Sequence, residues 1–315
     1  VVHNGREVRS NIISSQIDLH KLYGGVVPEI ASRKHIEKIN QVIEEALKEA
    51  DTTLDEIDAI GVTYGPGLVG ALLVGVAEAK AIAFAKNKPL IGVHHIEGHI
   101  SANYIEHPDL EPPFLCLVVS GGHTHLVCVK EYGKYEILGG TRDDAVGEAY
   151  DKVGRVLKVP YPGGPQIDRL AKQGKPSYNL PKPMDDDTYN FSYSGLKSAV
   201  INLVHNLHQK GLEVDANDLA CSFQEAALGV LIEKTKRAAL NYQVKQVVVA
   251  GGVSANSKLR ADLKQAFATT STQLVLPPLW SCTDNAAMIA MAGSYMYDKQ
   301  QFSSLDLSVK PNLAL

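Results

Sequence analysis

The strongest constraint on the fold is an order of strands and helices that occurs twice along the chain. In the first half, apolar residues recur at helical spacing after Pro28, a residue favoured at the first position of a helix. The segments predicted for this half are an extended stretch at 6–13, a helix from 28 to about 50, a strand at 57–64, a helix at 68–86, a strand at 89–93 and a helix at 95–107. Such alternation is typical of sheets covered by helices.

The second half opens with three strand-like runs and then alternates in the same way. Its predicted segments are strands at 114–119, 124–130 and 134–139, helices at 145–157, 195–209 and 216–242, a strand at 246–250, a helix at 254–267, a strand at 273–276 and a last helix from about 284. The Pro-rich stretch 108–113 is the expected boundary.

Two such halves predict an α/β protein of two ribonuclease-H-like lobes, the architecture of actin, the sugar kinases and the Hsp70 ATPases, with a nucleotide cleft between the lobes. We expect an N-terminal lobe at residues 1–112 and a C-terminal lobe at 113–315 with a helical insertion at about 160–242. On this template the opening strand of the first lobe is absent. Residues 1–6 contain neither an initiator Met nor an apolar segment, so no signal peptide is expected there.

Composition narrows the functional classes. With 315 residues, 45% of them hydrophobic and 21% charged, the chain fits a folded, soluble protein and not a disordered one. The formal net charge is -4, so a nucleic acid must bind a local patch. Candidate patches are Arg33-Lys34-His35 and the group Lys258, Arg260 and Lys264.

No membrane segment is expected, because the longest apolar stretch, 71–85, contains Glu78 and Lys80 and is shorter than the roughly 20 residues that span a bilayer. The four cysteines are scattered and form no C-x-x-C motif. A reducing, cytoplasmic location is therefore expected.

His95-Ile96-Glu97-Gly98-His99 places two imidazoles four residues apart. On a helix both would project from one face and could bind one cation. Ordinary surface or core histidines are the competing interpretation for an isolated pair. A zinc protease would need Glu directly after the first His, and Ile96 stands there, which disfavours that class.

Glycine pairs mark two possible anion sites. In Ser120-Gly121-Gly122-His123-Thr124 the glycines would let backbone N–H groups approach a phosphate, although an ordinary hairpin turn is equally consistent. Gly251-Gly252 follows a strand and precedes a helix with Asn256, a weaker signal for a nucleotide at a helix N-terminus.

Several carboxylates accompany these turns. Asp151 and Asp168 are of the kind that accepts ribose hydroxyls, whereas Asp143 and Asp144 are expected to cap a helix. Asp284, considered alone, is also expected to be a helix cap.

Taken together, the motifs resemble the bacterial TsaD family. The resemblance runs in order from about residue 5 to 295 and is carried by these segments: Gly24-Gly25-Val26-Val27-Pro28-Glu29, Gly65-Pro66-Gly67-Leu68, His95-Ile96-Glu97-Gly98-His99, Val119-Ser120-Gly121-Gly122-His123-Thr124, Tyr161-Pro162-Gly163-Gly164-Pro165, Phe191-Ser192-Tyr193-Ser194-Gly195-Leu196-Lys197, Ala250-Gly251-Gly252-Val253-Ser254-Ala255-Asn256 and Cys282-Thr283-Asp284-Asn285. Members were once labelled O-sialoglycoprotein endopeptidases.

The resemblance implies an acyltransferase that moves a threonylcarbamoyl group from its AMP anhydride to N6 of adenosine 37, in tRNAs that read codons beginning with A. It implies one divalent metal ion, iron by preference or zinc, bound by His95, His99 and Asp284. The implied adenylate contacts are Val118, Val119, Ser120, Gly121, Gly122, Asp151, Gly164, Asp168 and Asn256. Implied partners are tRNA, threonylcarbamoyl-AMP or ATP/AMP, the inactive paralogue TsaB and the small ATPase TsaE.

Two departures from the family pattern, an unassigned proton acceptor and two rival classes remain. Archaeal and eukaryotic relatives have a tyrosine ligand where this chain has Val118, and the family's opening strand and turn have no counterpart here. The group that accepts the amine proton is unassigned, with His123 a candidate. A sugar or acetate kinase, and a noncatalytic nucleotide-binding partner protein, are the rival classes, and neither needs the His pair.

Overall fold

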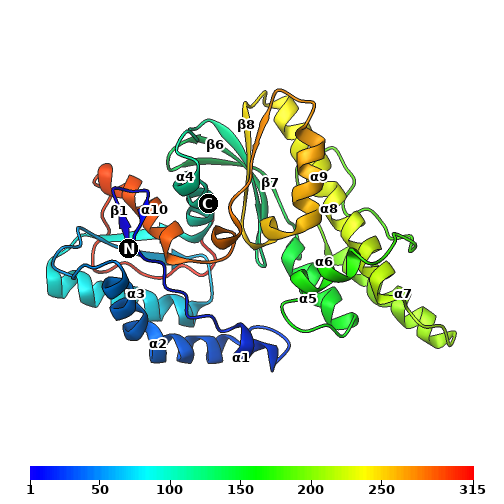
Figure 1. Ribbon diagram of the computed structural model, residues 1–315, viewed down its shortest axis with the longest axis horizontal. Helices are drawn as coiled ribbons and strands as arrows, with labels where there is room; N and C mark the ends of the chain where they lie inside the picture. Colours follow the sequence, from blue (N-terminus) through cyan, green and yellow to red (C-terminus); the bar gives the residue numbers. More distant parts are fainter.

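The fold is seen in a computed structural model that describes residues 1–315. Two groups of elements lie side by side (Figure 1). The first half of the chain contains β1 (Val2–His3), β2 (Glu7–Val8), α1 (Ile17–Lys21), α2 (Pro28–Glu49), β3 (Ile60–Gly65), α3 (Val69–Lys86), β4 (Leu90–His94) and α4 (His95–Glu106). The extended stretch predicted at 6–13 is therefore mostly irregular, with β2 its only strand.

The second half contains the larger sheet. Its elements are β5 (Phe114–Val119), β6 (Thr124–Glu131), β7 (Lys134–Gly140), α5 (Val146–Val156), α6 (Gly163–Ala171), α7 (Ser194–Gln209), α8 (Ala216–Asn241), β8 (Gln246–Ala250), the short 3-10 helix η1 (Gly252–Ala255), α9 (Ser257–Phe267), β9 (Gln273–Val275), the 3-10 helix η2 (Leu279–Ser281) and α10 (Ala286–Asp298).

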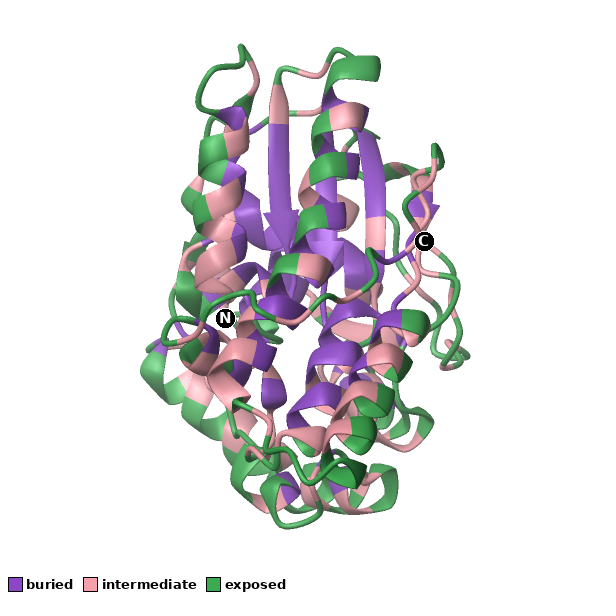
Figure 2. Ribbon diagram, turned by 90° about the vertical axis from the view of Figure 1, so that its right-hand side faces the viewer, coloured by how far each residue is buried: buried purple, intermediate pink, exposed green.

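Five strands form the sheet of the second half, in the order β7-β6-β5-β8-β9. β5 pairs antiparallel with β6 and parallel with β8, so it joins the meander to the parallel strands. Every residue of β5 is buried, which matches its uninterrupted apolar sequence, because a central strand with both faces covered does not alternate. Figure 2 shows this sheet as buried strands flanked by helices whose outer faces are exposed.

The first half has no comparable sheet. β1 pairs with β2 and β3 pairs with β4, and these are two separate two-stranded sheets with no ladder between them. The position that β5 fills in the second half therefore has no strand in the first half.

The end of the chain returns to the first half. α10 packs against α4 and β4, and residues beyond it contact β3 and β4: Ser303 pairs with Leu90, and the Lys310 N–H donates to Tyr64 O at 2.8 Å. We therefore call β1 to α4, with α10 and residues 299–315, the first lobe, and β5 to η2 the second lobe. The division at 112/113 stays a prediction, but α10 and the residues after it lie with the elements before it.

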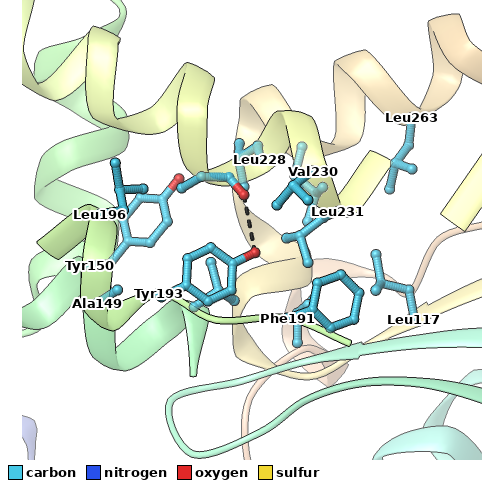
Figure 3. Packing of buried hydrophobic residues seen from close by; sticks show 14 of the residues in the cluster. Leu117, Ala149, Tyr150, Phe191, Tyr193, Leu196, Leu228, Val230, Leu231 and Leu263 are labelled. Carbon is cyan, nitrogen blue, oxygen red and sulfur yellow. Dashed lines mark hydrogen bonds between the residues drawn. The ribbon is translucent and has the colours of Figure 1, made fainter. Parts of the chain in front are cut away.

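The largest core belongs to the second lobe. It comprises 28 buried residues between the sheet and helices α5 to α9, and Figure 3 shows Tyr193 within it, its hydroxyl donating to Ala227 O at 3.1 Å. A second cluster of 13 residues joins the lobes, since Ile96, Ile100 and Tyr104 of α4 pack against β5 and β8. None of the helices is both long and apolar enough to cross a membrane.

Candidate metal centre and glycine turns

Two histidines project together from the start of α4. β4 ends at His94 and α4 begins at His95, and the His94 imidazole accepts the backbone N–H of Ile96 at 3.1 Å. This cap fixes the first turn of the helix, so that His95 and His99, one turn apart, lie on one face. Their ring centroids are 4.7 Å apart. The spacing H-x-x-x-H therefore produces the predicted pair.

Asp284 joins the two imidazoles from the start of α10. Its Oδ1 lies 3.1 Å from His99 Nε2 and 3.6 Å from His95 Nε2. The expectation that Asp284 caps a helix is wrong, because Asn285 is the cap and its side chain accepts the Met288 N–H at 2.9 Å. A shift of one residue frees the Asp284 carboxylate to face the histidines.

The three side chains form a donor set for a metal ion. Their ligand atoms all lie within 4.8 Å of one another, close to the roughly 4 Å that can separate two atoms bound to one metal at about 2.1 Å. The His99 side chain is only 1% exposed, yet neither of its ring nitrogens has a well-directed hydrogen bond. A buried imidazole whose nitrogens make no well-directed hydrogen bond is costly, and a cation bound between Nε2 and the Asp284 carboxylate would satisfy that nitrogen. The residues therefore fit a divalent metal.

The protonation states favour the same interpretation. Burial lowers the pKa of His95, although Asp284 opposes the shift, and burial lowers that of His123 to about 4, with His125 and His95 adding to the effect. Burial raises the pKa of the Asp284 carboxyl group. The neighbouring His99 and His95 together have the larger, opposite effect and lower this pKa to about 2. Neutral imidazoles and an ionised carboxylate are the forms that bind metals.

The turn at Ser120–His123 lies beside this cluster. The Ser120 N–H donates to His123 O at 2.8 Å, and the His123 N–H donates to Ser120 Oγ at 3.1 Å, which close the turn after β5. Atoms added at the Cβ positions of Gly121 or Gly122 would meet nothing within 4 Å, so the backbone faces open space. The His123 ring lies 6.5 Å from that of His95. Val118 and Val119 are fully buried in β5 and offer only their backbone.

The second glycine motif packs against the first. Gly251 has φ +91°, and a Cβ there would lie 2.4 Å from Val119 O, so only glycine allows this approach. Asn256 follows as the cap of α9, its Oδ1 accepting the Leu259 N–H at 2.9 Å. The two motifs, 130 residues apart in the sequence, therefore lie together at the ends of β5 and β8.

Asn256 and Asp168 are connected through Gln224 and Ser257, two residues that no sequence motif predicted. Asn256 Nδ2 donates to Gln224 Oε1 at 2.8 Å, and Asp168 accepts from Ser257 Oγ at 2.8 Å and from Gln224 Nε2 at 3.4 Å. Gln224 is 1% exposed. A glutamine within an otherwise apolar helical stripe was the available signal.

Asp151 and Gly164 form the last part of the arrangement. Asp151 Oδ1 accepts the Gly163 N–H at 2.8 Å, which ties α5 to the start of α6, and the space next to Gly164 is open. Burial raises the pKa of Asp151, against the effect of that hydrogen bond.

The acidic pair before α5 does not cap that helix, contrary to expectation. Asp143 Oδ1 accepts the N–H groups of Tyr193 and Ser194 at the start of α7, and Asp144 binds Lys152 and Lys197, each at 2.8 Å. Both carboxylates therefore hold α5 and α7 together.

Solved structures share the fold. The T. kodakarensis HypF crystal structure matches with a TM-score of 0.62 at 14% identity, over 86% of this chain and 45% of that chain. Component A of Acidaminococcus fermentans (R)-2-hydroxyglutaryl-CoA dehydratase matches with a TM-score of 0.51 at 16% identity, over 83% of this chain and 84% of that chain. At these identities the likeness establishes fold only, and it confirms the predicted α/β, actin-like class.

Sequence comparison is more specific. A protein of Bacillus thuringiensis (strain Al Hakam), named tRNA N6-adenosine threonylcarbamoyltransferase, is 59% identical over 99% of this chain and 92% of its own length. A protein of Clostridium botulinum (strain 657 / Type Ba4) with the same name is 56% identical over 100% of this chain and 93% of its own length. The family model described as "TsaD: tRNA N6-adenosine threonylcarbamoyltransferase" matches residues 7–291, and the chain belongs to this family.

Proposed function

We propose that this protein transfers a threonylcarbamoyl group from threonylcarbamoyl-AMP to N6 of adenosine 37 in tRNAs that read codons beginning with A. Family membership supports the reaction. The observation that carries it in this chain is the convergence of His95, His99 and Asp284 beside the open Ser120–His123 turn. A metal-ligating group next to a backbone that can hold a phosphate suits transfer from an acyl adenylate.

One divalent metal is part of the proposal, iron by preference or zinc, bound by His95, His99 and Asp284. When bound it would supply Lewis-acid polarisation of an oxygen of the donor. Val118 is fully buried and apolar, so no fourth protein ligand is proposed at its position.

The remaining residues bind and orient the donor. The backbone of Gly121 and Gly122, with no side chain in front of it, would hold the phosphate that leaves with AMP. Asp168 and Asn256, both fixed through Gln224, would hold the adenosine, and Asp151 and Gly164 would line the same site. His123 is neutral near pH 7 and close to the cluster, and it is the candidate acceptor of the proton from the adenine amine.

The rival classes explain fewer observations. A sugar or acetate kinase of this fold, or a noncatalytic nucleotide-binding protein, accounts for the glycine turns but not for a buried imidazole pair directed at a carboxylate. The protease alternative lacks its general base, because the position that needs a glutamate holds Ile96, which is buried in the core shared by the lobes.

Partners and location follow from the proposed reaction. tRNA is the substrate, and TsaB and TsaE are proposed accessory proteins. Neither basic patch from the sequence gains support, because Arg33 pairs with Glu29 and Lys258 pairs with Glu225 and Asp262. The four cysteines are free thiols, which suits the cytoplasm, where tRNA is modified.

The deciding experiment measures metal and product in matched variants. Purified protein should contain about one iron or zinc per chain by elemental analysis, lost in His99→Ala and retained in His208→Ala, an exposed control on α7. His95→Asn, at a less buried ligand, tests the same point if His99→Ala does not fold.

In the same experiment, nucleoside analysis of tRNA incubated with the protein, its partners and threonylcarbamoyl-AMP should detect modified adenosine with wild type and His208→Ala only. Full modification by folded, metal-free His99→Ala would exclude the metal role.

A further inference from the structure

The Gly24-Gly25 turn has no role in the function proposed above, yet it is a contact between the two lobes. The Arg155 Nε of α5 donates to Gly24 O at 2.9 Å, joining residues 131 apart in the sequence. No other residue of helices α5 to α9 forms a hydrogen bond with residues 1–112. On this side of the lobe junction, the hydrogen bonding between the lobes therefore comes from one exposed arginine.

The turn has a backbone shape that suits the guanidinium. Gly24 has φ +66° and Gly25 has φ +154°, both in the region that favours glycine. A Cβ atom on Gly25 would lie 2.6 Å from Arg155 Nη2. Any other residue at position 25 would displace the arginine.

The turn is also fixed within its own lobe. His20 is buried at the end of α1, its carbonyl accepts the Gly25 N–H at 3.1 Å, and its Nδ1 accepts the Val27 N–H at 3.4 Å. Its Nε2 lies 3.2 Å from Gln16 Oε1. Arg155 thus contacts a turn that its own lobe holds in place.

On the other side, Arg155 is linked to the proposed adenylate site. Asp151 lies one turn earlier on α5, on the same face of the helix. Burial raises the pKa of Asp151, and the Gly163 N–H and the positive charge of Arg155 act against that shift. Burial raises the pKa of Tyr161. The charges of Asp151 and Asp284 add to this shift, and that of Arg155 opposes it.

We propose that Arg155 is a positioning residue, an inter-lobe clasp that sets how closely the metal ligands of the first lobe approach the adenylate site of the second. The lobes share a core at α4, β5 and β8, so they have one attachment there and a second at the clasp. Two separate attachments fix the angle between the lobes, whereas a single attachment leaves that angle free to vary. The identity of the nucleotide rests on the proposed function, whereas the clasp itself does not.

The test breaks the contact from each side. Arg155→Ala removes the donor, Gly25→Ala displaces it, and the double variant does both. Spin labels on the exposed positions Glu44→Cys and Gln209→Cys, in a Cys221→Ser background, report the distance between lobes in the full chain. Each single variant should broaden the distance distribution and weaken AMP binding about fivefold. The double variant should match the singles, because both changes break one contact.

Arg169→Ala is the matched control, since this arginine of α6 bonds only to Gln166 and should change neither measurement. If Gly25→Ala fails to fold, Arg155→Lys is compared with Arg155→Ala instead of the double variant: lysine keeps the charge but not the planar guanidinium, so it should restore the distance distribution and AMP binding only in part. An unchanged distance distribution in Arg155→Ala, or fully additive effects on it, would overturn the clasp. Absence of AMP binding in the wild type would count against the proposed function, while the distance measurement would still decide on the clasp.

Discussion

The sheets of the two lobes are built from similar pieces but differ at their centres. In the second lobe, β5 lies between an antiparallel and a parallel partner, and all of its residues are buried. In the first lobe, β3 has one ladder partner, β4, and no strand connects this pair to β1 and β2. Since a sheet gains stability from each added partner, we expect β5, with two ladder partners, to be held more firmly than β3, which has one among these residues.

The cores show the same difference. The largest cluster confined to the second lobe has 28 buried residues, whereas those within the first lobe have six and three. The first lobe is held by the cluster that it shares with β5 and β8 of the second lobe, and by its own residues 303–311, which lie along β3 and β4. The proposed metal ligands His95 and His99 therefore lie on a helix, α4, that packs against strands of the second lobe.

Truncating one buried leucine to alanine in each sheet is the strongest test of this comparison. Leu117 of β5 belongs to the cluster of 28 and Leu90 of β4 to the cluster of three, and both are buried. We expect Leu117→Ala to cost about 4 kcal/mol of unfolding free energy and Leu90→Ala about 2 kcal/mol, because a small cluster relaxes more easily around the gap. Urea denaturation measures both. Equal losses would contradict the comparison.

Matched ion pairs give a smaller effect that depends on pH. Asp144 is 13% exposed and binds two lysines, whose hydrogen bonds overcome desolvation and lower its pKa, whereas Asp55 is 77% exposed and binds Lys86. At pH 7, Asp144→Asn should cost about 2 kcal/mol and Asp55→Asn under about 0.5 kcal/mol.

The folded pKa of Asp144 is depressed, so its contribution is complete above the unfolded value of about 3.9 and is lost as the pH falls through the folded value. Wild type and Asp144→Asn should therefore converge in acid. A difference that persists or grows at low pH would show that the lysines are not the cause.

Hydrogen exchange compares the strands without mutation. Amides of β5 and β8 should exchange only on global unfolding, and those of β3 and β4 at least about tenfold faster, through local opening of the first lobe. Mass spectrometry of peptides from each strand measures the ratio. Equal protection would show that the first lobe opens only when the second does.

The smallest effect concerns the chain end on β4. Ser303 Oγ accepts the Gly92 N–H at 3.0 Å, so Ser303→Ala should cost about 1 kcal/mol and speed exchange in β4. Ser308→Ala, an exposed serine nearby, is the control and should be neutral. No change in either variant would remove residues 303–311 from the supports of the first lobe.

The sequence by itself determined the local parts of this protein. Helical spacing predicted α2 and the shared face of His95 and His99, and an uninterrupted apolar run predicted the buried β5. Paired glycines marked the turns at Gly121 and Gly251. These succeed because periodicity and turn preference act over a few residues, and are visible in the order of the amino acids.

Only the tertiary structure decided which distant residues meet. Local sequence preference made Asp284 a helix cap, and only the family resemblance implied that it is a ligand. In the structure Asn285 is the cap, and the packing of α10 on α4 brings the Asp284 carboxylate to His99. Gln224, which links Asp168 to Asn256, is marked in the sequence only as a polar residue in an apolar helical stripe, and Arg155, which contacts Gly24, belongs to no motif. Their partners are chosen by the packing of helices onto sheets, and that packing depends on the whole core, which no short segment encodes.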